Sequence, residues 1–278
     1  MANSENILGH NLSFGSNTCF MDTGAEYQDI SPTWTYYTLP GTISIFEEDD
    51  KLATYDDDDF KPTKCEGPFF CGEKDGVAFC MQKACHAYRD GTETKEELPH
   101  DKLHYMITCF ATNNGMVILG SNISFDGTTD AMKAVVENCI WPGLVEIKSD
   151  NRQVTRGSVV YKDIDPNTTS QFEVEHKDVT KSWHRNKTSY AEGDVATNKM
   201  LGIVCQSDNP SKYAYSIQPK SKADAFTFVV ACNDEKIHAI DIGNNKLAVA
   251  CYEPGTFNYD GQDYTISQKG YSVIEKKS

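Results

Sequence analysis

The chain has 278 residues, of which 39% are hydrophobic and 11% aromatic, as expected of a folded globular protein rather than a disordered one. Its formal net charge is −15, from 41 acidic and 26 basic residues. Such a surface repels phosphate backbones, so we expect no nucleic-acid partner. No apolar stretch reaches the length of about 18 residues that a spanning helix needs, so we expect no membrane span.

The first half of the chain predicts β structure. Short runs of β-branched and aromatic residues stand at 35–38 and 42–46, which is typical of strands. Residues 105–110 and 116–119 form a predicted hairpin, because the Asn-Asn-Gly sequence at 113–115 tolerates the positive φ angles of a tight turn.

One segment of the first half has a different period. Residues 129–139 show helical spacing, with Met132, Val135, Val136 and Cys139 on one face. We therefore predict one short helix near 129–139, which would close the first half of the chain.

The second half again predicts strands. Residues 226–232 and 237–242 form a predicted hairpin that turns at 234–235. Residues 246–252 and 263–266 follow as further strands, separated by Pro-Gly and Asp-Gly turn dipeptides. The fold class expected is therefore mainly β and antiparallel.

The two halves resemble each other at a nearly constant spacing. Each of four cysteines ends an apolar run. Cys80 and Cys205 lie 125 positions apart, and Cys109 and Cys232 lie 123 positions apart. We interpret this as a tandem duplication of a unit of roughly 125 residues. The alternative is that strands ending in cysteine look alike without common origin.

The boundary between the two units is expected at Pro142-Gly143, a turn dipeptide. The prediction is two related, disulfide-bonded antiparallel β domains, each a barrel or a sandwich. The first would cover residues 1–143, and the second, diverged domain would cover residues 144–278.

Ten widely scattered cysteines favour disulfides. No two of them have the C-x2-C spacing of a zinc site, so we expect no metal. If the halves are duplicated, Cys80–Cys109 and Cys205–Cys232 are equivalent candidate pairs. Other connectivities stay open.

Four N-x-[ST] sequons agree with a secretory route. They are candidate glycosylation sites at Asn11, Asn122, Asn167 and Asn186. The first ten residues have neither the basic nor the apolar region of a signal peptide. We expect a secreted, extracellular glycoprotein whose signal peptide is not in this chain, with a reduced cytosolic protein as the alternative.

A strongly acidic stretch lies between residues 47 and 59. It lacks the alternating acids and the sixth-position glycine of an EF-hand. A solvated loop is the simplest interpretation, and a surface for a basic partner is the alternative. The carboxylates of that surface would be Glu47, Glu48, Asp49, Asp50, Asp56, Asp57, Asp58 and Asp59.

Four aromatic residues are candidates for a ligand-binding surface. Trp34, Tyr36 and Tyr37 cluster at the first predicted strand, and Tyr105 belongs to a later one. Aromatic side chains usually pack in a core, but in an open barrel they can also line a cavity.

No nucleophile elbow, P-loop or dinucleotide-binding glycine motif occurs in the chain. We therefore expect no catalytic residues and no cofactor. An active site built from residues far apart in the chain stays open as the less favoured possibility.

The first half resembles a lipocalin barrel. It has the early Trp34, several hairpins, a predicted helix and then Cys139, and the resemblance implies that Cys139 is tied back to Cys65 or Cys71. Residues 35–37 and 119–124 are also similar to pieces of the secreted chemokine-binding proteins of poxviruses, which are acidic β-sandwiches.

The predicted function is extracellular binding without catalysis. The favoured ligand is a small apolar or amphipathic molecule held in a barrel cavity. One alternative is capture of a basic protein of the cytokine or chemokine type by the acidic surface. Another is a structural component of an extracellular assembly, since tandem β domains with exposed edges suit that role.

Overall fold

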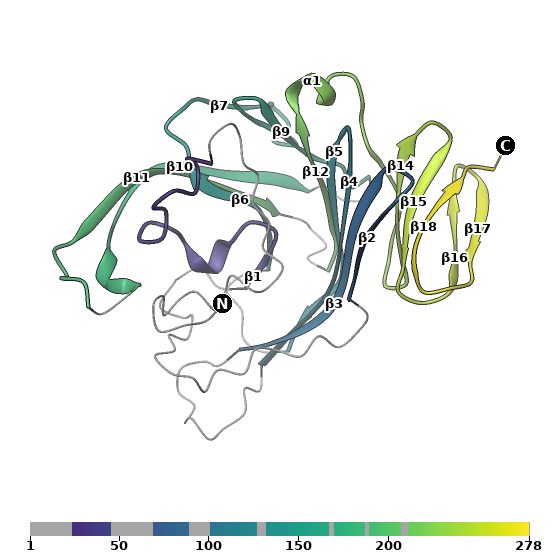
Figure 1. Cartoon of the computed structure of the whole chain (residues 1–278), viewed down its shortest axis with the longest axis horizontal. Helices are drawn as coiled ribbons and strands as arrows, with labels where there is room; N and C mark the ends of the chain where they lie inside the picture. Colours follow the sequence, from purple (N-terminus) through teal and green to yellow (C-terminus); the bar gives the residue numbers. More distant parts are fainter. Residues whose placement is uncertain are drawn as a thin grey trace.

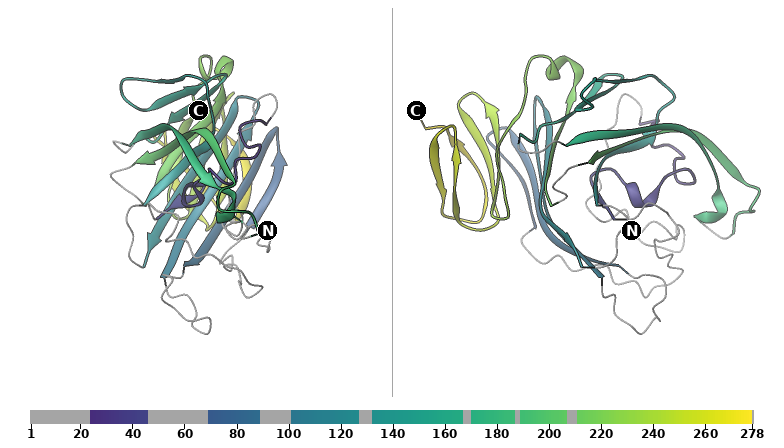
Figure 2. Two further views of the ribbon diagram at one scale, coloured as in Figure 1. Left: turned by 90° about the vertical axis from the view of Figure 1, so that its left-hand side faces the viewer. Right: turned by 180° about the vertical axis from the view of Figure 1, so that it is seen from behind.

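The computed structural model describes residues 24–45, 69–88, 101–126, 132–166, 170–186, 189–206 and 211–277. This part of the chain is mainly β, as predicted, with the single short α-helix α1 (Lys220–Ala223). Its strands form layers of sheet stacked side by side (Figures 1 and 2). The described ranges hold no helix that is long and apolar enough to cross a membrane.

The middle layer is an antiparallel sheet, here called the large sheet, with the strand order β2-β3-β4-β5-β12-β9-β8-β7. In Figure 1 it curves through the centre of the molecule. Its strands are β2 (Phe69–Lys74), β3 (Val77–Tyr88), β4 (Asp101–Thr112), β5 (Gly115–Phe125), β12 (Tyr213–Pro219), β9 (Val159–Asp163), β8 (Gln153–Arg156) and β7 (Val145–Ile147).

A second sheet, here called the inner sheet, lies on the concave side of the large sheet together with the 3-10 turn η2 (Tyr36–Thr38) (Figure 1). Its strand order is β1-β6-β11-β10. The strands are β1 (Ile43–Ser44), β6 (Lys133–Ile140), β11 (Val195–Gln206) and β10 (Gln171–Ser182), and the turn η4 (Trp183–Arg185) follows β10.

The C-terminal residues form a sheet on the opposite side of the large sheet (Figure 2). This C-terminal sheet has the order β13-β14-β15-β18, and a separate hairpin of β16 and β17 packs beyond it. The strands are β13 (Val229–Asn233), β14 (Ile237–Gly243), β15 (Lys246–Cys251), β18 (Gly270–Glu275), β16 (Gly255–Tyr259) and β17 (Gln262–Ile266).

The centre of the large sheet, at β5, is buried on both faces. In β5, Ile118 packs into the core shared with the inner sheet, whereas Val117 and Leu119 pack into the core shared with the C-terminal sheet. Side chains alternate along a strand, so a strand between two cores needs apolar residues at successive positions. This explains the uninterrupted Met-Val-Ile-Leu run at 116–119.

Both predicted hairpins are confirmed. Strands β4 and β5 pair in antiparallel register, with Thr112 opposite Gly115 at the turn. Gly115 has a φ of 131°, and a Cβ there would lie 2.5 Å from the Ile217 carbonyl oxygen, so glycine is required. Strands β13 and β14 form the second hairpin, with Asn233 opposite His238.

The helix predicted near 129–139 is wrong, because residues 133–140 form β6. This strand lies between β1 and β11, and residues 134–139 are all buried. Glu137 pairs with Ile203 and Val135 with Val204, so Val136 is an extra residue in a bulge. A bulge interrupts the two-residue alternation of a strand. Because β6 is also buried on both faces, it carries apolar residues at neighbouring positions, and together these two features gave the spacing that we interpreted as helical.

The described sheets do not close into a barrel. Strands from both sides of Pro142-Gly143 share the same sheets, since β5 pairs with β12 and β6 pairs with β11. The cysteine-ending runs also lie in different surroundings. Those of Cys80 and Cys109 are neighbours in the large sheet, whereas Cys205 lies in the inner sheet and Cys232 in the C-terminal sheet.

Candidate functional site

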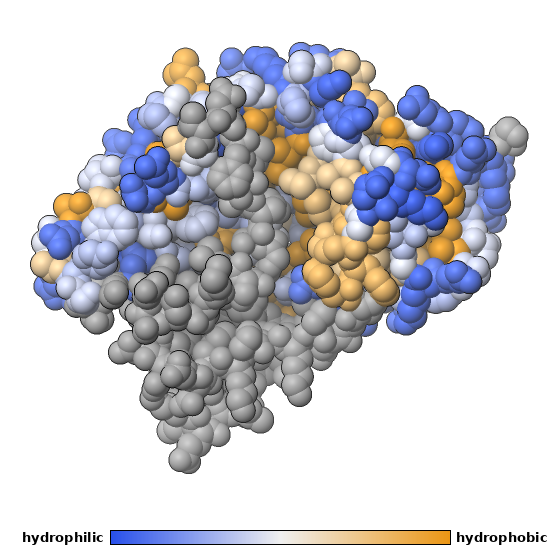
Figure 3. All heavy atoms as spheres, in the orientation of Figure 1, coloured by the Kyte–Doolittle hydropathy of each residue, from blue (hydrophilic) through white to orange (hydrophobic). Residues whose placement is uncertain are grey.

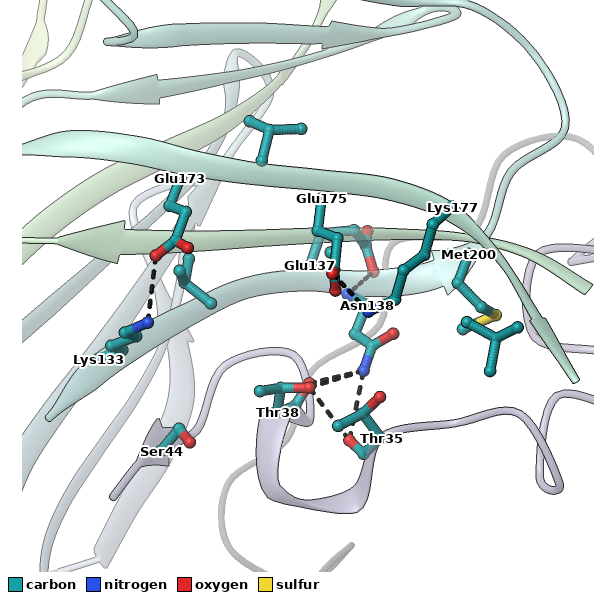
Figure 4. A pocket seen from close by; sticks show the side chains of 14 residues that line it. Thr35, Thr38, Ser44, Lys133, Glu137, Asn138, Glu173, Glu175, Lys177 and Met200 are labelled. Atoms are coloured by element: carbon teal, nitrogen blue, oxygen red, sulfur yellow. Dashed lines mark hydrogen bonds and ion pairs between the residues drawn. The ribbon is translucent and has the colours of Figure 1, made fainter. Parts of the chain in front are cut away.

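A polar cavity of about 530 Å³ lies between η2 and the inner sheet (Figure 4). Strands β6, β10 and β11 form one wall, and the η2 segment with β1 forms the other. Its polar lining consists of the hydroxyl, amide, carboxylate and ammonium side chains of Thr35, Thr38, Ser44, Asn138, Glu137, Glu173, Glu175, Lys133 and Lys177.

Asn138 fixes the η2 wall against β6. Its Nδ2 donates to the Thr38 carbonyl oxygen at 3.0 Å, to Thr38 Oγ1 at 2.9 Å and to the Thr35 carbonyl oxygen at 3.3 Å. Trp34 Nε1 in turn donates to the Asn138 carbonyl oxygen at 2.9 Å. The 3-10 turn is thereby held by side-chain hydrogen bonds in a place where few regular backbone bonds are available.

Two lysines at the cavity lie beside carboxylates of β10. Lys133 Nζ lies 3.1 Å from Glu173 Oε2, and Lys177 forms a close ion pair with Glu175. The Lys177–Glu175 pair is exposed on both sides, and such a pair contributes about 1 kcal/mol or less to stability, so Lys177 can exchange Glu175 for an anionic ligand at small cost. The Lys133 side chain is 19% exposed and that of Glu173 is 53% exposed, so this pair is only partly open to solvent.

Glu137, one of the lining residues, has a buried carboxyl group that joins the inner sheet to the large sheet. It accepts from Tyr27 Oη and Tyr161 Oη, each at 2.7 Å, and from its neighbouring backbone N–H of Asn138 at 3.0 Å. Its Oε2 also lies 3.5 Å from an Arg156 guanidinium nitrogen. Burial raises the pKa of the Glu137 carboxyl, whereas Arg156 and the hydrogen bonds oppose that rise.

The lining is suited to a hydrated, hydroxyl-rich ligand rather than to an apolar one. Carboxylate and carbonyl oxygens accept hydrogen bonds, ammonium groups donate them and bind anions, and threonine and serine hydroxyls do both. The described residues contain no group of three or more His, Cys, Asp or Glu side chains placed to hold a metal ion.

The structure does not bring the four predicted aromatic residues into one cavity. Trp34 and Tyr36 pack in a core cluster around Leu39, and Tyr105 packs in the core between the inner and large sheets. The Tyr37 side chain lies outside the described residues. Trp34 still bears on the site, but indirectly, through its hydrogen bond to Asn138.

The seven cysteines whose side chains the structure describes are free thiols. Cys139 is buried, with its Sγ 3.0 Å from Arg156 Nη1, and Cys71 is exposed on β2, so the structure does not join these two. Cys205 and Cys232 likewise lie in different sheets. Cys80 and Cys109 are register partners on β3 and β4, and their pairing stays a prediction.

Several predicted residues lie outside the described ranges: the acidic stretch from Glu47 to Asp59, together with Cys65, Asn11 and Asn167. Of the other sequons, Asn122 is exposed. Asn186 is only 4% exposed and its Nδ2 donates to Tyr36 Oη at 2.9 Å, so its side chain belongs to the interior.

Sequence analysis missed the residues of the cavity. Lys133, Glu137 and Asn138 fall in the segment predicted as a helix, which assigned them to the wrong faces. Two signals were present. A Glu-Asn pair inside an apolar run indicates buried polar groups that need partners. Glu173, Glu175 and Lys177 alternate along β10, which places them on one face of a strand.

Comparison with known proteins extends the structural description. A family model described as polysaccharide lyase family 8, super-sandwich domain, matches residues 1–229. A chondroitinase AC lyase solved in oligosaccharide complexes is similar with a TM-score of 0.69 at 16% identity, over 99% of this chain and 41% of its own. The search of curated proteins found no match.

Two further solved structures share the fold. The Streptomyces coelicolor A3 chondroitin AC lyase in complex with chondroitin sulphate has a TM-score of 0.68 at 18% identity, covering 92% of this chain and 34% of its own. A Paenibacillus xanthan lyase has a TM-score of 0.63 at 14% identity, covering 100% and 28%. This chain therefore spans less than half the length of each of these proteins.

These matches correct the predicted function. The resemblances to lipocalins and to poxvirus chemokine-binding proteins are wrong, because the fold is the super-sandwich of polysaccharide lyases. The same finding overturns the non-enzymatic carrier of a small apolar ligand, the acidic binder of basic proteins and the structural component. Because the family match extends over 229 of the 278 residues, the chain belongs to polysaccharide lyase family 8.

Proposed function

We propose that the chain forms the β part of a polysaccharide lyase that acts on an acidic polysaccharide, and that the cavity between η2 and the inner sheet binds its sugar residues. Family membership supports the reaction class. The solved relative in complex with chondroitin sulphate supports the substrate class. Since the chain spans 41% or less of these relatives, the activity of the whole enzyme is part of the proposal.

The observation that carries the proposal is the polar lining of the cavity. Glu173, Glu175 and Asn138 offer acceptors for sugar hydroxyl groups, and Thr35 and Thr38 offer groups that both donate and accept. A carbohydrate presents such hydroxyls on every residue, and a polar cavity can exchange its bound water for them without leaving buried groups unpaired.

The two cavity lysines supply the attraction for an anionic sugar. The formal net charge of −15 repels a polyanion at long range, so binding needs cations at the site itself. Lys133 and Lys177 are the ammonium groups in the lining. A charge-assisted hydrogen bond to a sulfate or carboxylate would replace the ion pair that each makes with β10.

The reaction class provides its own assay. A lyase breaks a glycosidic bond by elimination rather than by adding water, and a sugar carboxylate makes the proton on the adjacent carbon acidic enough to remove. The product carries a double bond conjugated to that carboxylate and absorbs in the ultraviolet. Hydrolysis would release reducing ends without this absorbance.

The test combines binding and elimination on the full chain. Chondroitin sulphate and xanthan are titrated calorimetrically and incubated with the chain while ultraviolet absorbance is followed. We expect the Lys133→Ala and Lys177→Ala variants to weaken binding by about tenfold each, which corresponds to about 1.4 kcal/mol. Lys220→Ala is the matched control, because Lys220 is an exposed lysine on α1, outside the cavity lining.

Unchanged affinity in both cavity variants would show that the cavity does not hold the polysaccharide. Absence of both binding and the absorbing product with either polysaccharide would contradict the proposed function as a whole. Loss of binding in Lys220→Ala to the same degree would mean that only overall charge matters.

We also propose that the chain works outside the cell and that its sequence arose by duplication. The ten cysteines and the exposed sequon at Asn122 support an oxidising secretory route. The shared spacing of the cysteine-ending runs supports related halves, residues 1–143 and 144–278. Glycosidase-sensitive mass at Asn122 in protein from a secreting cell would test the first of these.

A further inference from the structure

Three cysteines lie in a row across three neighbouring strands of the large sheet. Cys71 of β2 is directly opposite Cys80 of β3, and Cys80 is directly opposite Cys109 of β4. Directly opposite residues of antiparallel strands project their side chains from the same face of the sheet. Cys71 Sγ lies 3.0 Å from Cys80 Sγ.

The three thiols differ in their access to solvent. Cys71 is exposed, on an edge strand in which all six residues are exposed. Cys80 is half-buried, and Cys109 packs against the core between the inner and large sheets. Figure 3 shows an apolar patch at the place that β2 and β3 occupy in Figure 1. The exposed Phe69 and Phe70 belong to β2.

We propose that Cys71 and Cys80 form a site of oxidative modification, at which a small-molecule disulfide such as oxidised glutathione converts the two thiols into a disulfide that closes the β2–β3 hairpin. Opposite residues of antiparallel strands have Cα atoms about 4.5–5.5 Å apart, within the range that a disulfide spans. The contact between the two sulfur atoms distinguishes this pair from Cys80–Cys109.

The reaction takes place in two exchange steps. The Cys71 thiolate attacks one sulfur of the reagent, forms a mixed disulfide and releases one thiolate. The Cys80 thiolate then attacks the Cys71 sulfur, forms the protein disulfide and releases the second thiolate. Each protein thiol loses one proton, each released thiolate gains one, and the two electrons reduce the reagent to two thiols.

Accessibility sets the order of the two steps. Cys71 is the thiol that a reagent in solution reaches first. Burial, together with Cys71, raises the pKa of Cys80 to about 12, so Cys80 reacts when the mixed disulfide is already beside it. Burial also raises the pKa of Cys109 to about 12, so acidity does not separate the two thiols, and the 3.0 Å contact with the Cys71 sulfur is what favours Cys80.

The disulfide would fasten β2, which among the described strands pairs only with β3. Phe79 of β3 stacks on Tyr271 of the C-terminal sheet with ring centroids 3.8 Å apart, so the hairpin also touches the next layer. A Cβ at Gly72 would lie 3.1 Å from the Phe79 ring, so β2 runs directly beside this stack. Oxidation would therefore hold β2 at the junction of two sheets.

The test is a non-reduced peptide map of the folded full chain after equilibration with oxidised glutathione and alkylation of free thiols. Trypsin cleavage after Lys64, Lys74 and Lys83 places Cys71 in the peptide 65–74 and Cys80 in the peptide 75–83. We expect these two peptides to be linked in the wild-type chain. Fragmentation of the linked pair locates the bond at Cys71 rather than Cys65, without the need for a variant.

Matched variants separate the possible partners. Cys71→Ser should abolish the link, whereas Cys65→Ser and Cys109→Ser should keep it. The proposal is overturned if the peptide 75–83 is linked to the Cys109 peptide, if the bond is located at Cys65, or if both thiols stay free at a glutathione ratio that oxidises an exposed dithiol standard.

Discussion

We expect His238 to make the joint between the large sheet and the C-terminal sheet sensitive to acid. It lies on β14 and is fully buried, with Nε2 2.7 Å from Ser121 Oγ of β5 and Nδ1 2.8 Å from Thr108 Oγ1 of β4. Tyr252 Oη lies 2.8 Å from the same threonine oxygen. Burial lowers the pKa of His238 from 6.5 to about 3, because a charged imidazole would lose its water here.

A lowered histidine pKa means that the folded state resists protonation, whereas the unfolded chain takes up a proton near pH 6.5. The stability that His238 contributes is therefore complete above pH 6.5 and is lost progressively as the pH falls toward about 3. Each pH step of one unit below 6.5 costs about 1.4 kcal/mol, so the loss at about pH 5 is about 2 kcal/mol.

The assay is urea unfolding at about pH 7.5 and about pH 5, followed by tryptophan fluorescence. His238→Gln should be less stable than wild type at the higher pH, by about 1–3 kcal/mol, because its hydrogen bonds are altered. It should then lose about 2 kcal/mol less on acidification. Ser121→Ala removes one partner but keeps the imidazole, so its acid sensitivity should remain. Equal acid sensitivity in wild type and His238→Gln would refute the reasoning.

Two further substitutions test the packing around the large sheet. Arg156→Met leaves the buried Glu137 carboxylate without its cation and should lower the free energy of unfolding by about 3–5 kcal/mol in urea titrations. The double variant Arg156→Met with Glu137→Leu should recover much of this loss, because it leaves no unpaired buried charge. Gly120→Ala places a Cβ 2.1 Å from the buried Tyr213 ring and should cost about 1–3 kcal/mol; a thermal midpoint equal to wild type would contradict this.

The sequence predicted the strands and hairpins whose signals are local. The turns at 113–115 and 234–235 have residues that favour reversal, and the alternation beside them is strong enough to place β4, β5, β13 and β14. The same local signals cannot show which strands pair over long distances. The pairing of β5 with β12 and of β6 with β11 therefore was not predictable from them.

The cavity residues depended on an element that local patterns misassigned. The bulge at Val136 moves residues of β6 out of simple alternation, so Glu137 and Asn138 were placed on a helix. Trp34 and Tyr36 were candidates for a ligand-binding surface, with packing in a core as the usual alternative, and their surroundings are set by residues such as Met200 and Asn186, 150 or more positions away. Aromatic composition alone does not tell a core from a cavity wall.

Because β5 is buried on both faces, its apolar residues do little to fix its register against β4 and β12. Sliding the strand by one residue would exchange Val117 and Leu119 with Ile118 between the two cores, and these side chains are nearly equal in size and polarity. Hydrophobic pattern therefore distinguishes the two alignments weakly. Gly115 and Gly120 distinguish them strongly, because only glycine fits beside the Ile217 carbonyl and under the Tyr213 ring. In β5 the two glycines therefore fix the register, and the register determines which core each apolar side chain enters.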